Sequence, residues 1–267
     1  LHKSLSDSKL DDVSIYDCTS QWGVFAIAGP KSRNFLKKLV ISEDPDKTLS
    51  NKQFPWLSYR DIEIGMCPVR ALRVAYTGEL GWELHHPIEM QNYLLDILLS
   101  SGKEFNLKLV GARAQNWLRQ EKSYKAFGSD LGRDAGPFES KLSRFVDINK
   151  NFLGKDALLK RKTDVSCVTL LIDGPKDIDP WGREALYNET EEVMLGRLTS
   201  AGYSVHFKRS IGIGYVKSSF SEVGTKLRIK IDDAFWNAQI VRDSPYDPQN
   251  ERIIDLSLIH ISEPTRR

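Results

Sequence analysis

Along the first 160 residues, the apolar positions follow the spacing of a strand in some segments and that of a helix in others, which predicts a mixed α+β fold. Residues 24–28 form a short apolar run, and apolar positions at helical spacing follow a glycine turn, which predicts a strand and then a helix with Pro30 at its first position. Several short strands punctuated by Gly and Pro are expected across residues 54–86, in a mostly antiparallel sheet.

The next segments carry clearer helical signals. Apolar residues recur at near-helical spacing from Ile88 and stop at Gly102, which predicts an amphipathic helix. We expect a short strand at "LKLVG" (107–111) and a further helix at 112–124. Residues 127–139 are rich in Gly, Asp and Pro, as in an ordered loop, and long loops of this kind are often functional.

The pattern changes beyond a short helix predicted within 151–162. From Ser166 to Ile254, strand-like runs recur at intervals of about 8 to 12 residues with Gly turns between them, as in a small β-barrel or a sandwich. We therefore expect an α+β domain at 1–162 and an all-β domain at 163–255.

Both ends of the chain invite a separate interpretation. The first residue is Leu1 rather than Met, so we expect coding sequence upstream. Residues 256–267 resemble the translation of a sequencing-library adapter, and we expect them to be a non-native tail.

Composition narrows the class of protein. The chain has 267 residues, 40% of them apolar, and a net charge of +2, which fits a soluble globular protein without a nucleic-acid surface. No apolar run approaches the ~20 residues that span a bilayer, so no membrane partner is expected. The 3 cysteines lack CxxC spacing, so neither a disulfide framework nor a zinc site is indicated.

The stretch "RVAYTGELGWELHHP" (73–87) has the pattern of a hairpin. Gly78 and Gly81 can adopt positive φ, so a tight reversal is expected between a strand ending at Tyr76 and a strand starting at Trp82.

Glu83 is the candidate ligand-binding residue of this hairpin. Strand alternation puts Glu83 and His85 on one face, with Trp82 and Leu84 on the other. A carboxylate facing a cleft can accept two parallel hydrogen bonds from a planar 2-amino-pyrimidinone such as a pterin, and Tyr76 could pack on the ring. From the residues alone, a solvated Glu is the commoner situation in hairpins.

Other motifs are weaker, and no independent catalytic motif is present. His85 and His86 lack a third ligand nearby for a metal site. The charges of "LRQEK" (118–122) fit a solvated or structural ion pair. Asp130 and Asp134 could be general bases, although loop aspartates usually bond their own backbone.

Seven blocks in order resemble one known family across residues 13–254. They are "FAIAGPKSRNFL", "YTGELGWEL", "LRQEKSYKAFGSDLGRDAGPFE", "NFLGKDAL", "GRLTSAGYS", "SIGIGYV" and "SPYDPQNER". The resemblance is to the folate-binding, T-protein-like half of the dimethylglycine and sarcosine dehydrogenases, which is itself similar to the aminomethyltransferase of the glycine cleavage system. It implies a ferredoxin-like α+β folate lobe, truncated at its N-terminus, followed by a small β-barrel.

The resemblance also implies a binding site. In this family the hairpin lines the tetrahydrofolate pocket, which assigns cofactor-binding roles to Tyr76, Glu83, Leu84 and His85. Some members have an aromatic residue where this chain has Arg144, which could instead contact the folate carboxylates. No residue of this chain is expected to be catalytic, and none to bind a metal.

The implied activity belongs to a longer protein. A missing FAD domain would oxidise a small N-methyl amino acid, and this chain would hold the tetrahydrofolate that captures the one-carbon unit as 5,10-methylenetetrahydrofolate. Gln115 stands where aminomethyltransferases tend to have Arg, which favours the dehydrogenases. Two alternatives stay open: a regulatory subunit of pyruvate dehydrogenase phosphatase, or a stand-alone aminomethyltransferase. The family expectation for a eukaryote is the mitochondrial matrix.

Overall fold

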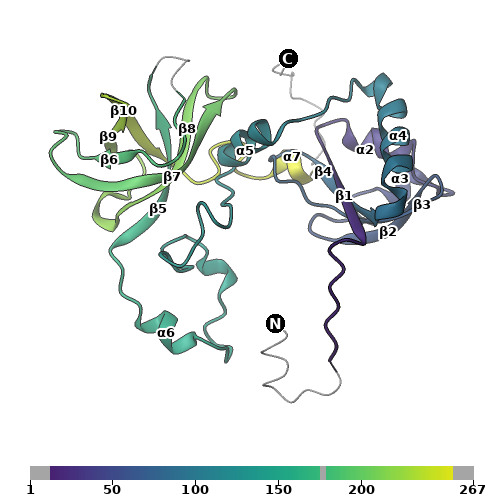
Figure 1. Ribbon diagram of the computed structural model, residues 1–267, viewed down its shortest axis with the longest axis horizontal. Helices are drawn as coiled ribbons and strands as arrows, with labels where there is room; N and C mark the ends of the chain where they lie inside the picture. The colour runs from purple at the N-terminus through teal and green to yellow at the C-terminus, as the bar shows by residue number, and fades with distance from the viewer. Residues whose placement is uncertain (1–12, 175–178, 255–267) are drawn as a thin grey trace. The chain divides into compact units, whose positions relative to one another are not determined.

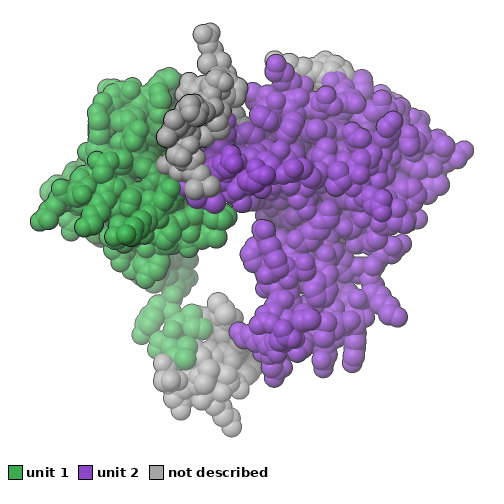
Figure 2. All heavy atoms as spheres, turned by 180° about the vertical axis from the view of Figure 1, so that it is seen from behind, with its two compact units in different colours: residues 1–75, 80–108 green, residues 76–79, 109–267 purple. Residues whose placement is uncertain are grey.

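The structure, a computed structural model, describes residues 13–174 and 179–254. The chain divides into two compact units, shown in different colours in Figure 2. Unit 1 comprises the chain up to Ala75 and residues 80–108, and unit 2 comprises residues 76–79 and everything from Leu109 onward. Each unit is described by itself below, with the element labels of Figure 1.

Unit 1 is a four-stranded antiparallel sheet with helices packed on one face. The strands lie in the order β1-β4-β3-β2, so β4 is an inner strand. In chain order the elements are β1 (Trp22–Ala28), α2 (Ser32–Lys37), α3 (Pro45–Thr48), β2 (Tyr59–Ile64), β3 (Cys67–Leu72), β4 (Gly81–Pro87), the 3₁₀ turn Ile88–Met90, α4 (Gln91–Gly102) and the 3₁₀ turn Lys103–Phe105.

The core of unit 1 fills the face of the sheet that carries helices α2 and α4. Trp82 and Leu84 of β4 are fully buried there, against Phe35 of α2 and Leu94 of α4. Because side chains alternate along a strand, the residues between these core positions all emerge on the other face. That face has no helix of unit 1 packed on it, and it carries Glu83.

The connection between β3 and β4 corrects the prediction of a tight hairpin. Strand β3 ends at Leu72 rather than Tyr76, so eight residues, 73–80, join it to β4. Gly78 does have positive φ (+79°). Gly81 does not, and a Cβ there would lie 2.6 Å from the carbonyl oxygen of Ile27, so this glycine serves the close approach of β1.

Unit 2 contains a closed six-stranded barrel, so of the two architectures predicted for the all-β segment the barrel is correct and the sandwich is not. The strand order is β10-β5-β8-β7-β6-β9, and every pair is antiparallel. Its elements are α5 (Ala112–Glu121), the 3₁₀ turn Ser143–Phe145, α6 (Lys155–Lys160), β5 (Val165–Ile172), β6 (Ala185–Tyr187), β7 (Met194–Ser204), β8 (Arg209–Lys217), the 3₁₀ turn Ser218–Phe220, β9 (Lys226–Ile231), β10 (Ala234–Val241) and α7 (Glu251–Ile254).

The barrel interior is filled by aliphatic side chains from all its strands. Leu170, Leu186, Val216 and Ile229 are completely buried in one cluster. Glycines let neighbouring strands approach: a Cβ at Gly196 would lie 1.9 Å from the carbonyl oxygen of Tyr215. The periodic Gly-rich runs of the sequence therefore correspond to a packed barrel.

Two further element predictions are wrong in detail. Residues 107–110 form no strand; they contain the division between units 1 and 2, and Leu109 and Val110 are 80% and 64% exposed. Helix α2 begins at Ser32, so Pro30 lies in the preceding turn rather than at the first helical position.

The other element predictions are confirmed. The loop 127–139 contains no helix or strand, and the helices near 91–102, 112–121 and 155–160 are present. The domain boundary expected near residue 162 lies between α6 and β5 and stays a prediction. The proposed non-native tail, 256–267, lies outside the described residues. Within residues 13–174 and 179–254, no helix has the length and apolar character needed to cross a bilayer.

Candidate functional site

Glu83 projects from the middle of β4 onto the face of unit 1 opposite its core. It is paired with Ala26 of β1 and Leu72 of β3, so strands flank it on both sides. Its carboxylate Oε2 lies 3.2 Å from Nε2 of His85, two residues along the same face. The Glu83 side chain is 38% exposed and that of His85 30%, so both are half-buried and reachable.

The neighbours of Glu83 along β4 point the other way. Leu84, a predicted site residue, is fully buried in the core, so only its backbone is offered to the face of Glu83. His86 is also fully buried, its Nδ1 lies 2.9 Å from the carbonyl oxygen of Leu84, and its ring stacks on Phe25. Because His85 and His86 emerge on opposite faces, they do not form one metal site.

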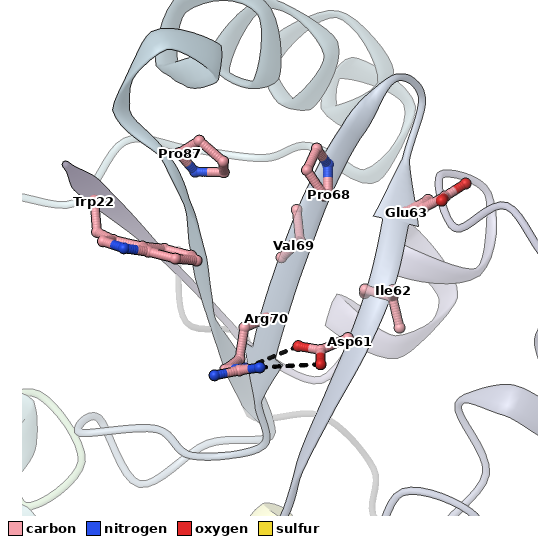
Figure 3. Close-up of a pocket in the computed structure, with 8 residues that line it drawn as sticks. All are labelled: Trp22, Asp61, Ile62, Glu63, Pro68, Val69, Arg70 and Pro87. Carbon is pink, nitrogen blue, oxygen red and sulfur yellow. Dashed lines mark hydrogen bonds and ion pairs between the residues drawn. The ribbon is translucent and has the colours of Figure 1, made fainter. Parts of the chain in front are cut away.

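A pocket of about 250 Å³ lies near Trp22 and Pro87, where β1 begins and β4 ends (Figure 3). Alternation along β4 puts Pro87 on the same face as Glu83. Trp22, Pro68 and Pro87 supply much of its wall, and Figure 3 shows Asp61 turned toward Arg70. Two hydrogen bonds, of 2.8 and 3.1 Å, join that pair, which lowers the pKa of the Asp61 carboxyl. The pocket is therefore mostly apolar; of its charged residues Asp61 and Arg70 are paired, and Glu63 has no bonded partner among the described residues.

Tyr76 belongs to unit 2, where it forms an aromatic pair with Tyr124. The ring centroids are 6.0 Å apart and the planes are 15° from parallel. The guanidinium of Arg119 lies 6.0 Å from the centroid of Tyr76. Burial raises the pKa of Tyr76, and the positive charge of Arg119 opposes that rise.

Arg119 is held by a buried ion pair with Asp130. Its Nη1 is 2.6 Å from a carboxylate oxygen of Asp130. The guanidinium of Arg119 also donates to the carbonyl oxygen of Tyr124 at 2.6 Å and to the hydroxyl of Ser200 at 2.7 Å. Asp130 accepts further hydrogen bonds from the hydroxyls of Thr199 and Ser200 and from the backbone N–H of Ala126. Helix α5, the loop and strand β7 are thus joined through two side chains.

Arg144, the remaining predicted site residue, stands in the 3₁₀ turn Ser143–Phe145 and is exposed. Its guanidinium lies 4.7 Å from the ring centroid of Phe145. Burial raises the pKa of Tyr124, the charge of Asp247 adds to the rise, and the charge of Arg144 opposes it. Tyr76 therefore stacks on Tyr124, whereas Arg144 acts on Tyr124 through its charge.

Residues 76–79 are fastened within unit 2 by the segment that follows the barrel. The hydroxyl of Tyr246 donates to the Glu79 carboxylate at 2.5 Å. Lys122, fully buried, donates to the carbonyl oxygen of Asp247 at 2.6 Å and to the side chain of Asn250 at 2.7 Å. Burial lowers the pKa of the Lys122 ammonium.

These contacts revise two expectations about charged residues. Arg119, Glu121 and Lys122 of "LRQEK" are neither solvated nor paired with one another, because each is buried and bonds to residues distant in sequence. Asp130 does bond the backbone of its own loop, as expected, but it is fully enclosed and unsuited to act as a base. Asp134 is almost completely exposed.

The sequence predicted no role for Tyr124, and for Arg119 only a place in a solvated or structural ion pair. Both lie within the "LRQEKSYKAF" block, and Tyr124 follows the end of α5 directly. The only signal available was an aromatic residue amid buried-looking charges next to a long loop, which does not reveal contact with a residue 48 positions earlier in sequence.

The comparisons with known proteins identify the family. Residues 1–150 match the GCVT N-terminal domain, and residues 166–247 match the glycine cleavage T-protein C-terminal barrel domain. The chain belongs to this T-protein family, and its resemblance to the dehydrogenase branch is confirmed by the relatives described next.

Curated relatives include two dehydrogenases of Mus musculus. The mitochondrial dimethylglycine dehydrogenase is 37% identical over 239 residues, a match that covers 87% of this chain and 26% of the relative. The mitochondrial sarcosine dehydrogenase is 28% identical over 250 residues, covering 90% of this chain and 26% of the relative. The chain thus spans about a quarter of the length of these relatives.

A solved structure agrees on the fold. The aminomethyltransferase T of the glycine cleavage system from Bartonella henselae superposes with a TM-score of 0.71 at 20% identity, over 85% of this chain and 60% of that one. The α+β lobe followed by a barrel is therefore the fold of this chain, and the family supports a folate-binding T-protein-like module.

Proposed function

We propose that this chain holds tetrahydrofolate within an FAD-dependent dehydrogenase of dimethylglycine or sarcosine. In the proposal, residues 1–162 form the folate lobe, residues 163–255 its barrel, and FAD belongs to a domain outside this chain. One observation carries it: Glu83 presents a reachable carboxylate, next to His85, from an inner strand whose other face is core. The 37% identity to a dimethylglycine dehydrogenase supports the substrate class.

The chemistry of Glu83 fits a pterin. Among the described residues His85 bonds the carboxylate through Oε2, so Oε1 and the remaining lone pairs are open to a ligand. The 2-amino-pyrimidinone edge of a pterin offers two parallel N–H donors that match a carboxylate. Charge-assisted hydrogen bonds of this kind are worth roughly 1.5 to 3 kcal/mol each.

The work of the chain in the reaction is to position the folate. FAD, when bound elsewhere in the protein, supplies the two-electron oxidation of the N-methyl group. Glu83 fixes the pterin so that its N5 meets the incoming one-carbon unit, and the product is 5,10-methylenetetrahydrofolate. Holding the acceptor in place turns a bimolecular capture into an intramolecular one, which lowers the barrier by several kcal/mol. Less formaldehyde then escapes to solvent.

The proposal assigns roles to three further residues. Tyr76 and Arg144 are assigned to the aromatic system and to the carboxylates of the folate, respectively. Leu84 contributes through its backbone, because its side chain is committed to the core. In a eukaryote we place the protein in the mitochondrial matrix, as the names of its mouse relatives suggest.

Replacing Glu83 by Gln tests the proposal. In the full-length protein, calorimetry with tetrahydrofolate should show affinity reduced tenfold or more for Glu83→Gln, since one amide oxygen replaces a charged double acceptor. Glu63→Gln is the matched control, because Glu63 is an exposed carboxylate on β2, lies on the same face and has no bonded partner among the described residues. Unchanged affinity in Glu83→Gln would reject the assignment.

The same measurements distinguish the rival functions. A regulatory subunit without oxidoreductase activity would not turn over dimethylglycine or sarcosine, with or without folate. An aminomethyltransferase would bind tetrahydrofolate but require an aminomethylated carrier protein rather than a free N-methyl amino acid. Turnover of the free N-methyl amino acid by the full-length protein would therefore identify the dehydrogenase, and turnover of the aminomethylated carrier protein would separate the other two.

A further inference from the structure

We infer that Tyr124 is a second ligand-contacting aromatic residue, which packs on the aminobenzoyl ring of a folate between Tyr76 and Arg144. The inference rests on the proposed function and extends it to a residue without an assigned role. Two observations in unit 2 support it: the rings of Tyr76 and Tyr124 stack, and the positive charge of Arg144 acts on Tyr124.

These three side chains suit the three parts of a folate. The molecule runs from a pterin through an aminobenzoyl ring to a glutamate with two carboxylates. If Tyr76 takes the pterin and Arg144 the carboxylates, the middle position falls to Tyr124. An aromatic wall suits an aminobenzoyl ring, and an Arg suits carboxylates because its planar donors bond them in pairs.

The geometry of the pair decides how a ligand can reach it. At 6.0 Å between centroids and 15° between planes, Tyr76 and Tyr124 contact each other and leave no room for a third ring between them. Both side chains are only half-buried. A ligand ring must therefore pack along their accessible surfaces, side by side.

Tyr124 is held rigidly enough to serve as such a wall. Its backbone N–H donates to the carbonyl oxygen of Arg119 at 3.0 Å, and its own carbonyl oxygen accepts from the Arg119 guanidinium at 2.6 Å. That guanidinium is buried in its ion pair with Asp130. Both anchors use the backbone of Tyr124, so they do not cover the part of the ring that Tyr76 leaves accessible, and the hydroxyl of Tyr124 bonds no described residue.

The test compares a whole folate with a truncated one. In the full-length protein, Tyr124→Ala should weaken tetrahydrofolate about tenfold and leave 6-methyltetrahydropterin, which lacks the aminobenzoyl ring, unchanged. Tyr124→Phe keeps the ring and should bind both compounds like the wild type. Retained pterin binding also shows in the same sample that the variant is folded.

A variant of Arg144 provides an independent binding test. Arg144→Gln should weaken tetrahydrofolate about tenfold but leave tetrahydropteroate, which lacks the glutamate, unchanged. Equal affinity of Tyr124→Ala and wild type for tetrahydrofolate overturns the inference, as does an equal loss for both compounds. Wild-type protein that binds no tetrahydrofolate would instead overturn the proposed function itself, so the two failures are distinguishable.

Discussion

Arg119 and Asp130 form an ion pair from which water is almost completely excluded, with side chains 3% and 0% exposed and 2.6 Å between Nη1 and the carboxylate. A pair this deep is costly to bury, and its value depends on every remaining donor and acceptor being satisfied. The hydroxyls of Thr199 and Ser200 of β7 donate hydrogen bonds to the Asp130 carboxylate. These bonds join the loop 127–139 to the barrel at Asp130.

Breaking this pair from one side should destabilise the protein strongly. Arg119→Met leaves the carboxylate buried without its cation, and Asp130→Leu leaves the guanidinium without its anion, so each should lower the free energy of unfolding by about 3 to 5 kcal/mol. In Arg119→Met/Asp130→Leu the losses should be clearly less than additive. Urea denaturation of the four proteins in a double-mutant cycle measures the coupling, and simple additivity would contradict it.

Two features of the structure require glycine at position 78: its backbone conformation and the nearness of the Lys122 side chain. Its φ is +79°, and a Cβ would lie 2.4 Å from Cγ of the buried Lys122. Gly128 has a similar φ of +92° but open space around the Cβ position. Gly128→Ala should therefore cost about 1 kcal/mol of stability from backbone strain alone, and Gly78→Ala at least about 1 kcal/mol more. Equal melting midpoints for the two variants would show that Lys122 yields without cost.

Leu84 should act through the core of unit 1. Truncating this fully buried side chain in Leu84→Ala should lower the free energy of unfolding by about 2 to 5 kcal/mol. His85→Ala, on the half-exposed opposite face, should change it by no more than about 0.5 kcal/mol. Chemical denaturation of both variants checks the contrast, and similar losses would mean that the face of His85 is more tightly packed than its exposure indicates.

Local sequence patterns were sufficient to predict much of this fold. Alternation along β4 predicted which side of the strand carries Glu83 and His85, and helical spacing predicted α4, because both depend only on neighbours in sequence. The regular spacing of strands predicted an all-β segment but left a barrel and a sandwich open; the barrel was implied only by the family resemblance. One failure shows the limit of such patterns: the segment 107–111 has β-like residues but forms no strand, and it contains the division between the two units.

The parts of the site that could not be predicted depend on contacts between distant residues. Lys122 meets Asn250, which is 128 positions away, and Arg119 meets Ser200 across 81 positions. Burying a charged side chain without a partner is unfavourable, so the sequence alone predicts that these side chains lie in solvent. Only the arrangement of unit 2 supplies the partners, and the same holds for Tyr124 against Tyr76.

Alkaline pH should reveal the enclosure of Cys167. Burial raises the pKa of its thiol from 9.0 to about 11. Between those values the unfolded chain releases the proton while the folded chain keeps it, so stability should fall as pH rises from 9 and the loss should reach about 2 to 3 kcal/mol near pH 11. Burial also raises the pKa of Tyr215 from 10.0 to about 12, so the interval from pH 9 to 10 isolates the thiol best. Urea titrations across that interval should show a shallower decline for Cys167→Ala than for the wild type, whereas Cys18→Ala, at an exposed site, should follow the wild type. Parallel declines in all three proteins would mean that water reaches the Cys167 thiol in the folded state.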